Sequence, residues 1–398
     1  MRRRADLGGH ERRGRPGCFR LERLFGRRAG GPFGRPFGRP LGCLLGGLTL
    51  SLTLHAMPAT ALAAASGARG PKPGVPHGTR PAADGFARAQ RAAFGAFAAE
   101  LAAREALPLQ WTLAQLGQAR HLAEVRRLIM PAAPGQPKNW QAYRERFVEP
   151  ERIRAGLAFW HAHESWLERA EAEYGVPPEI VVAIVGVETF YGRVVGRWRV
   201  LDALATLAFD FPAGRSDRSA FFRAELEAFL LWCRREGIEA TEPRGSYAGA
   251  IGLPQFMPSS LQRWGVDFDG DGHVDLRGSA PDAVGSVARY LAYFGWQRGL
   301  AAYYAVEPPA EPAERAALLA PDIVPSFNAA QFAEHGARLA APGLNHPGLL
   351  ALIELDNGGA ARSYYAGSTN FYAITRYNWS SYYAMAVIAL AEALKAAR

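Results

Sequence analysis

The sequence predicts a mainly α-helical protein of α+β type, with a small β region near its C-terminal end. Three observations lead to this prediction. Apolar residues recur at helical spacing over much of residues 84–300. Strand-like apolar runs lie on either side of an Asp-Asn-Gly-Gly turn at residues 356–359. Hydrophobic residues make up 49% and aromatic residues 11% of the 398 residues, which favours a packed core over disorder.

The first 65 residues are predicted to be an export leader. They contain twelve Arg, no Lys and three acidic residues, and so carry the whole formal charge of +9. The apolar run from Leu41 to His55 is short for a membrane span. Small residues follow it at 61–65, as at a signal cleavage site. We therefore expect an exported, periplasmic protein; a leader retained as a membrane anchor is the alternative left open.

The chain beyond the leader has no net charge. Of the 46 basic and 37 acidic residues, 34 of each lie there. A balanced body is not the basic platform that nucleic-acid binding requires, so that class of function is excluded. Cys233 is the one cysteine beyond the leader and cannot form an internal disulfide. We expect a monomer that is stabilised by its core.

The remaining segments are assigned in chain order. Residues 66–83 are rich in Gly, Pro and Ala and are predicted to be a flexible linker. A region at 84–398 then comprises a helical part at about 84–180, a core at about 175–300, and the β region with a C-terminal helix at about 345–398. Residues 305–325 are expected to be loop with a short helix. Helices are expected at about 86–127, 153–174, 181–191, 221–235, 283–294 and 382–395.

The helix predicted at residues 181–191 carries a carboxylate on its apolar face. That face consists of residues at i, i+3, i+4 and i+7, namely Val181, Ile184, Val185 and Glu188. Pro178 is expected to begin the helix and Gly192 to end it. Burial of Glu188 would raise its pKa and keep it protonated near neutral pH, as protonation of a glycosidic oxygen requires. The alternative is a glutamate at the edge of this face that reaches water.

Residues 245–260 combine glycines with neutral hydrogen-bonding side chains. Gly245, Gly249 and Gly252 permit close approach of the backbone. The polar side chains are Ser246, Tyr247 and Gln255. This mixture suits a sugar, which presents hydroxyl groups, acetamido groups and apolar ring faces. The alternative is a glycine-rich connection between helices.

Residues 266–275 match the first half of a calcium-binding loop. The candidate ligands are Asp267, Asp269, Asp271 and His273, the last through its carbonyl oxygen. The twelfth position is Gly278 instead of the usual Glu, and Asp282 is the nearest later acid that would complete the site. We expect a structural Ca²⁺ and no cofactor for catalysis. A solvated acidic turn is the alternative.

Five blocks of sequence in one order resemble the lytic murein transglycosylase B family, over about residues 84–398. The blocks lie at residues 188–192, 201–207, 245–260, 267–275 and 370–378. The resemblance implies a lysozyme-like helical core at about 175–300. It also implies an enzyme that acts on peptidoglycan glycan strands. Such an enzyme cleaves the β-1,4 bond between N-acetylmuramic acid and N-acetylglucosamine and leaves a 1,6-anhydromuramic end.

The resemblance also assigns roles to residues. The family's catalytic acid falls on Glu188, which would protonate the leaving oxygen and then take the proton of the sugar's own C6 hydroxyl. The implied substrate-binding residues are Ser246, Gln255, Phe256, Met257, Tyr290, Tyr377, Asn378, Tyr383 and Tyr143. For each tyrosine the alternative is packing in the core. Leu253 and Pro254 depart from the Tyr-Gly that is frequent in the family, and are expected to reshape one subsite while leaving Gln255 in place.

Two other functions stay open on sequence alone. A hydrolytic muramidase of the lysozyme type would use water in place of the C6 hydroxyl group, and its product would be heavier by one water molecule. A non-catalytic wall-binding protein would not need the acid at Glu188.

Overall fold

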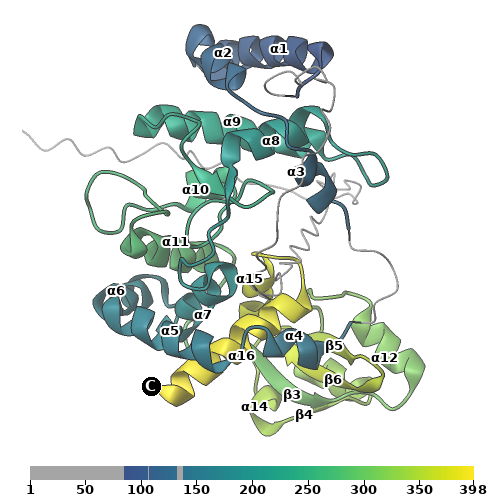
Figure 1. The fold of residues 1–398 in the computed structure, drawn as a ribbon. Helices are drawn as coiled ribbons and strands as arrows, with labels where there is room; N and C mark the ends of the chain where they lie inside the picture. Colours follow the sequence, from purple (N-terminus) through teal and green to yellow (C-terminus); the bar gives the residue numbers. More distant parts are fainter. Residues whose placement is uncertain (1–84, 106, 132–137) are drawn as a thin grey trace, which may run out of the picture. The chain divides into compact units, whose positions relative to one another are not determined.

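The structure is a computed structural model that describes residues 85–105, 107–131 and 138–398. The predicted leader at 1–65 and linker at 66–83 lie outside these residues. All described residues fall within one unit of the chain, 47–398. Helices dominate and strands are few, which confirms the predicted fold class (Figure 1). Within the described ranges, no helix is both long and apolar enough to cross a membrane.

The first helical region is broken into short helices. The pattern expected at 86–127 forms α1 (Arg88–Glu105), α2 (Leu109–Gly117) and α3 (Ala123–Leu128). Pro108 separates the first two because it has no amide hydrogen to donate within a helix. α1 packs through Phe94 and Phe97 against the ring of Phe209, with centroids 4.7 and 5.7 Å away.

The helices expected at 153–174 and 181–191 also differ in extent from the prediction. The first is two helices, α5 (Pro150–Ala162) and α6 (Glu164–Tyr174), which meet at the non-helical His163. The second, α7 (Pro178–Thr189), begins at Pro178 as predicted but ends before Gly192. Nearly every residue of α7 is buried, not one face alone. Its neighbours are α5, α6, α11 (Ala280–Tyr293) and α16 (Ser381–Ala397).

The middle of the chain adds elements that the sequence pattern did not predict. These are α8 (Val200–Phe209), α10 (Pro258–Trp264), and the short strands β1 (Trp198–Arg199) and β2 (Arg244–Gly245), which pair antiparallel. The expected helix at 221–235 is α9 (Ser219–Glu236), which packs on α8 and α10. Short apolar runs such as that of α8 were missed because helical periodicity needs more residues to become distinct.

The C-terminal part contains a four-stranded antiparallel sheet in the order β4-β3-β6-β5. β5 (Ala351–Asn357) and β6 (Ala360–Gly367) form the predicted hairpin, with Gly358 and Gly359 in its turn. The further strands are β3 (Tyr303–Glu307) and β4 (Arg338–Leu339). The helices here are α12 (Pro312–Leu319), α13 (Ala329–Glu334), α14 (Ala341–Leu344) and α15 (Thr369–Thr375). β3 and α15 were not predicted; β3 begins just before the segment expected to be loop.

The last helix connects the sheet to the buried helix. α16 contacts α7, β5 and α4 (Trp140–Glu145), as Figure 1 shows. α7 and α16 run antiparallel: Lys395 pairs with Glu179 at 2.9 Å near one end, and Tyr383 contacts Glu188 at the other. This pairing places the start of α16 beside the carboxylate that the sequence singled out.

Candidate active site

Glu188 lies in the last turn of α7 and is largely withdrawn from solvent. The Tyr383 hydroxyl group donates a hydrogen bond of 2.6 Å to its Oε1. Burial raises the pKa of Glu188 to about 7, and the hydrogen bond from Tyr383 limits the rise because it favours the ionised form. At neutral pH the group is therefore poised between its acid and base forms.

A pocket opens beside Glu188, and segments far apart in the sequence line it. The lining residues are Glu188, Ala250, Gln255, Phe256, Met257, Ser260, Tyr290, Tyr377 and Asn378. Of these described residues, Glu188 is the one with a carboxyl group. Six of the predicted substrate-binding residues therefore lie around the predicted acid.

The backbone next to the acid adopts strained conformations. Phe190 and Tyr191 have φ angles of 52° and 57°, and Gln255 has one of 50°. These are three of the four non-glycine residues with positive φ in the described part of the chain. Such strain persists only where surrounding contacts enforce it, and it is concentrated at functional sites. The Thr189 hydroxyl group links the two segments, because it donates to the carbonyl of Leu253 at 2.9 Å.

Gln255 is held so that one polar atom remains available to a ligand. Its amide nitrogen donates to the carbonyl oxygens of Val195 at 3.1 Å and Gly252 at 2.9 Å. Both amide hydrogens are thereby used, and its Oε1 accepts no hydrogen bond from any described residue. Gln255 can therefore accept a hydrogen bond from a bound sugar.

Aromatic rings form one wall of the pocket. The ring centroid of Tyr377 lies 4.6 Å from that of Tyr290, 5.7 Å from that of Phe256 and 6.4 Å from that of Tyr383. Tyr290 is fixed by a hydrogen bond of 2.6 Å from its hydroxyl group to the carbonyl of Arg376. The Tyr377 hydroxyl group and Asn378 Oδ1 are buried without a partner in the described structure. Unpaired buried polar atoms are costly, which marks these two as atoms for a ligand to satisfy.

Three predicted residues do not line the pocket. The Ser246 hydroxyl group accepts hydrogen bonds from the amides of Ala248 and Ala250, so it shapes the turn that presents Ala250. Tyr143 packs against Phe147 and Tyr382, and burial raises its pKa to about 12. The third residue is Tyr383, which contacts Glu188 through its hydroxyl group.

Sequence reasoning missed Ser260, Ala250 and the buried Glu225. Glu225 on α9 accepts two hydrogen bonds from Ser259, one from its backbone amide at 2.9 Å and one from its side-chain hydroxyl group at 2.7 Å. This contact fixes the start of α10, where Ser260 lies. The available signals were a carboxylate within the apolar run of α9 and the position of Ser260 two residues after a helix-starting Pro258.

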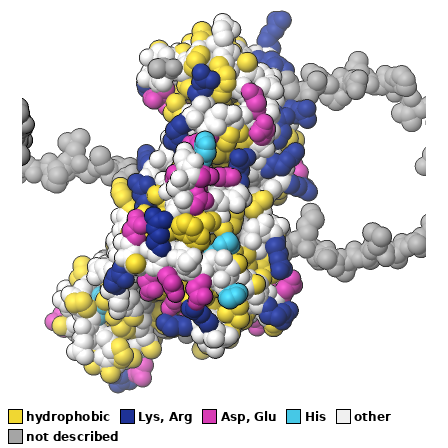
Figure 2. Space-filling model, turned by 90° about the vertical axis from the view of Figure 1, so that its left-hand side faces the viewer, with side chains coloured by type: hydrophobic (Ala, Val, Ile, Leu, Met, Phe, Trp, Pro, Cys, Tyr) yellow, Lys and Arg dark blue, Asp and Glu magenta, His cyan; other side chains and the backbone are white. Residues whose placement is uncertain are grey.

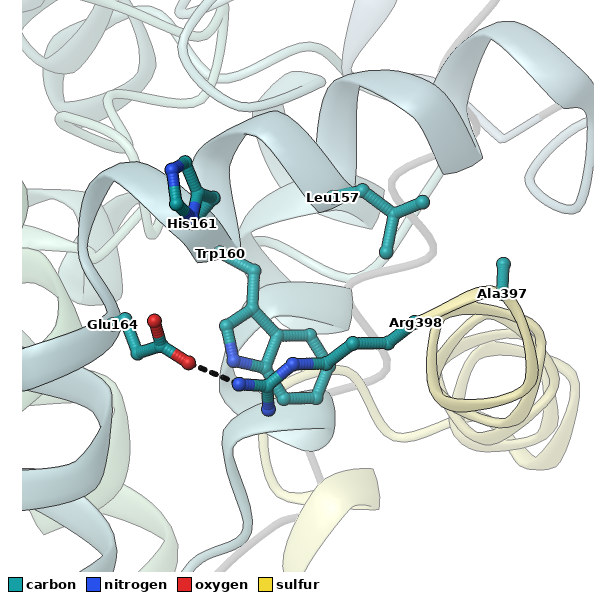
Figure 3. A pocket seen from close by; sticks show the side chains of 6 residues that line it. All are labelled: Leu157, Trp160, His161, Glu164, Ala397 and Arg398. Carbon is teal, nitrogen blue, oxygen red and sulfur yellow. Dashed lines mark hydrogen bonds and ion pairs between the residues drawn. The ribbon is translucent and has the colours of Figure 1, made fainter.

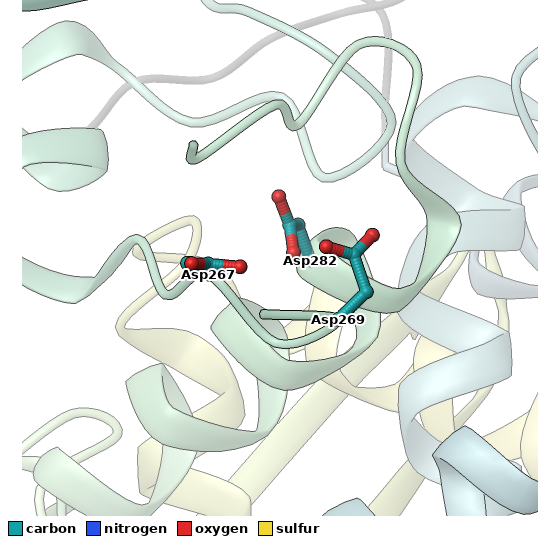
Figure 4. Close-up of side chains that lie close together, drawn as sticks. All are labelled: Asp267, Asp269 and Asp282. Atoms are coloured by element: carbon teal, nitrogen blue, oxygen red, sulfur yellow. The ribbon is translucent and has the colours of Figure 1, made fainter. Parts of the chain in front are cut away.

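Three of the predicted metal ligands converge at the acidic loop. Carboxylate oxygens of Asp267, Asp269 and Asp282 lie within 4.8 Å of one another (Figure 4). Hard oxygen donors of this kind fit a calcium ion. The Asp271 carboxylate is not part of the cluster. The predicted role of the His273 carbonyl oxygen stays a prediction, because the cluster consists of side-chain oxygens only. The Asp271 carboxylate accepts from the amide of His273 at 2.8 Å, and the His273 ring contacts Glu236 at 3.2 Å.

A second pocket lacks the features of the pocket beside Glu188. It is lined by Leu157, Trp160, His161, Glu164, Ala397 and Arg398 (Figure 3). The guanidinium of Arg398 lies over the ring of Trp160 at 4.6 Å and pairs with Glu164. Because that cation and carboxylate neutralise each other, no unpaired acid is left here for catalysis. The face in Figure 2 shows both basic and acidic side chains, in keeping with the balanced charge of the body.

Comparisons with known proteins identify the family. The model of the transglycosylase SLT domain matches residues 89–392. This chain belongs to the SLT-domain transglycosylases. It is 41% identical over 299 residues to membrane-bound lytic murein transglycosylase B of Escherichia coli K12, covering 71% of this chain and 77% of that protein.

Solved structures agree with this family assignment. SltB1 from Pseudomonas aeruginosa is 37% identical with a TM-score of 0.70, covering 77% of this chain and 99% of that chain. Slt35 from Escherichia coli, solved in complex with bulgecin A, is 40% identical with a TM-score of 0.67, covering 76% and 92%. The resemblance seen in the sequence is thus confirmed. The protein is a peptidoglycan lytic transglycosylase with a lysozyme-like helical fold, and the non-catalytic alternative is set aside.

Proposed function

We propose that this transglycosylase cleaves the β-1,4 bond between N-acetylmuramic acid and N-acetylglucosamine and forms 1,6-anhydromuramic acid, with Glu188 as both acid and base. One observation carries the proposal. Glu188 is the one carboxyl group among the described residues that line the pocket, and its pKa is raised to about 7.

The reaction takes place in two proton transfers through one group. The Glu188 carboxyl group gives its proton to the glycosidic oxygen as the bond from C1 of the muramic residue to that oxygen breaks. The C6 hydroxyl oxygen of the same residue then bonds to C1, and its proton passes to the Glu188 carboxylate. A pKa near neutrality suits both transfers. The hydrogen bond from Tyr383 holds Oε1 in place throughout.

The absence of a second carboxylate from the described lining favours internal attack over hydrolysis. Glycosidases that use water or an enzyme nucleophile pair the acid with a second carboxylate, about 5–9.5 Å away. A hydroxyl group on the substrate itself has a high effective concentration and needs less activation. The hydrolytic muramidase remains the competing reaction, and product mass separates the two.

The pocket provides polar and apolar groups for a sugar. We assign Gln255 Oε1, the Tyr377 hydroxyl group and Asn378 Oδ1 to the hydroxyl and acetamido groups of the substrate. Phe256, Met257 and Tyr290 contribute the apolar wall, while Tyr383 acts through its hydrogen bond to Glu188. Ser246 and Tyr143 act indirectly. SltB3 from Pseudomonas aeruginosa has been solved with NAG-anhNAM-pentapeptide, and we assign the same class of ligand, peptide-bearing glycan, to this chain.

The acidic loop is assigned to a structural calcium ion. Slt35 has been solved in complex with calcium. Asp267, Asp269 and Asp282 would hold the ion through their carboxylates, and the His273 carbonyl oxygen is the further ligand that we assign. The enzyme would act as an exported, periplasmic monomer, either free or attached to the membrane through the leader.

The test compares Glu188→Gln with Glu179→Gln, a second glutamate on the same helix that pairs with Lys395. We expect Glu188→Gln to lower the release of anhydromuropeptides by at least about 10³-fold, because no proton reaches the leaving group. Glu179→Gln should retain activity within about twofold, because it removes only one ion pair whose Lys395 member is exposed. Mass spectrometry of the products should show anhydro ends. Exclusively reducing muramic ends would establish the hydrolytic reaction instead.

A further inference from the structure

Arg376 lies between three aromatic rings just after α15. The centre of its guanidinium is 5.1 Å from the ring centroid of Trp379, 5.2 Å from that of Phe294 and 5.6 Å from that of Tyr372. All four side chains are partly exposed. The rings therefore hold the cation in place at the surface and do not bury it in the core.

The charge of Arg376 is not neutralised by any described residue. No described carboxylate forms an ion pair with it, and its one hydrogen bond to a side chain is a long one of 3.4 Å to the Tyr372 hydroxyl group. None of its nitrogens is among the buried atoms without a partner, so its remaining N–H groups reach solvent. A guanidinium held beside aromatic rings, with N–H groups free, is suited to a carboxylate.

This cation borders the active-site pocket. Along the chain, Arg376 and Trp379 flank Tyr377 and Asn378, which line the pocket beside Glu188. The backbone of Arg376 is fixed from the same side, because its carbonyl accepts the hydrogen bond from Tyr290. Arg376 is thus adjacent in the chain to the pocket wall, on the side where a group that extends from a bound sugar would approach it.

We propose that Arg376 and the rings of Phe294, Tyr372 and Trp379 form a binding site for a carboxylate of the acidic peptide that muramic acid carries. This proposal rests on the proposed function, since it needs a muramyl residue in the pocket. The peptide bears free carboxylates, and the rings offer apolar contact to its short side chains. Arg376 thereby sets a preference for glycan that still carries its peptides.

The experiment measures kcat/KM of the full chain on two substrates. One is glycan strands with their peptides, and the other is the same strands after an amidase has removed the peptides. The readout is the ratio of the two values. Arg376→Gln, which keeps part of the side chain for packing, should lower this ratio about tenfold, the size of one charge-assisted hydrogen bond. Arg376→Lys should give an intermediate ratio because it keeps the charge but loses the planar fork.

The control is Arg338→Gln, which removes an exposed arginine on β4 that pairs with Glu307; its ratio should equal that of the parent. The parent enzyme should cleave strands whose peptide carboxylates have been converted to amides with the same kcat/KM as strands without peptides. A ratio unchanged by Arg376→Gln would overturn the proposal. This holds also if kcat/KM on both substrates falls equally, because an equal loss indicates a purely structural effect. An undiminished preference for amidated peptides would also overturn it. Product mass in the same digests tests the anhydro chemistry separately, so either proposal can fail alone.

Discussion

Glu188 and Tyr383 are 195 residues apart in the chain, and one hydrogen bond between them tunes the acid. Burial and the hydrogen bond act in opposite directions on the pKa of Glu188. Burial disfavours the carboxylate, while the Tyr383 hydroxyl group favours it. The result of about 7 keeps both forms accessible, as a group that must first give and then take a proton requires.

The pH dependence of activity tests this balance. The rate should fall as pH rises through about 7, because the proton for the leaving oxygen is lost. Tyr383→Phe removes the bond that favours the ionised form, so the pKa of Glu188 should rise and the alkaline limb should move to higher pH, by on the order of one unit. Tyr382→Phe is the control, since that hydroxyl group bonds to Asp356. A limb that stays in place or moves to lower pH contradicts the assignment.

The same pKa affects stability. Below about pH 4.5 both folded and unfolded chains hold the proton of Glu188, and its ionisation has no effect on the free energy of unfolding. As pH rises toward 7 the unfolded chain loses this proton first, so the folded state is progressively destabilised until the folded pKa is passed. Glu188→Gln is free of this cost. Its free energy of unfolding relative to that of the parent should therefore rise from pH 5 to pH 8 by about 2–3 kcal/mol. Urea unfolding at the two pH values measures it; a pH-independent difference would be inconsistent with a buried acid.

At the scale of elements, the connection at residues 245–257 positions the pocket through its glycines. Gly252 has a φ of 74°, and a Cβ there would lie 2.2 Å from the carbonyl oxygen of Leu276. The same carbonyl oxygen accepts a hydrogen bond from the amide of Leu253 at 2.8 Å, which fixes the connection two residues before the strained Gln255. Gly245 and Gly252 allow the predicted close approach of backbone, and the approach is to the protein's own chain.

Two alanine substitutions separate the close contact from backbone strain. Gly252→Ala should cost about 3 kcal/mol or more of stability and lower activity, because the carbonyl must move and Gln255 moves with it. Gly237→Ala, at a φ of 67° with no atom within 4 Å of the added Cβ, should cost only about 1 kcal/mol. Urea unfolding compares the two. Equal costs would mean that the crowding at Leu276 does not constrain the connection.

At the scale of the whole molecule, the pocket depends on segments that the acidic loop holds together. The Asp282 carboxylate, at the start of α11, accepts hydrogen bonds from the amides of Phe268 at 2.7 Å and Asp275 at 2.8 Å. It thereby ties the loop to the helix that carries Tyr290. An ion bound there would stabilise the folded chain by mass action, without a part in the chemistry.

Calcium should therefore raise the melting temperature of the chelated protein. At a hundredfold excess over Kd the gain corresponds to about 2.7 kcal/mol. Asp282→Asn should abolish the gain, while Asp275→Asn, whose exposed side chain pairs with Arg277, should keep it. Differential scanning calorimetry measures both. No gain in the parent protein would remove the calcium assignment.

The sequence by itself determined the features that depend on the spacing of nearby residues. It located the acid on α7, the hairpin at Gly358 and Gly359, and the alternating aspartates, because each is a pattern within a few consecutive residues. The order of the five blocks further indicated the family, its chemistry and the residues around the pocket.

Only the tertiary structure decided which side chains meet. Spacing could not show that Tyr383 donates to Glu188, that Ser246 caps its own turn, or that the Asp271 carboxylate lies outside the acidic cluster. Nor could it show β3, whose partner β6 lies some sixty residues later in the chain. The physical reason is that burial and hydrogen-bond partners are set by contacts between distant segments, and these exist only once the chain is packed.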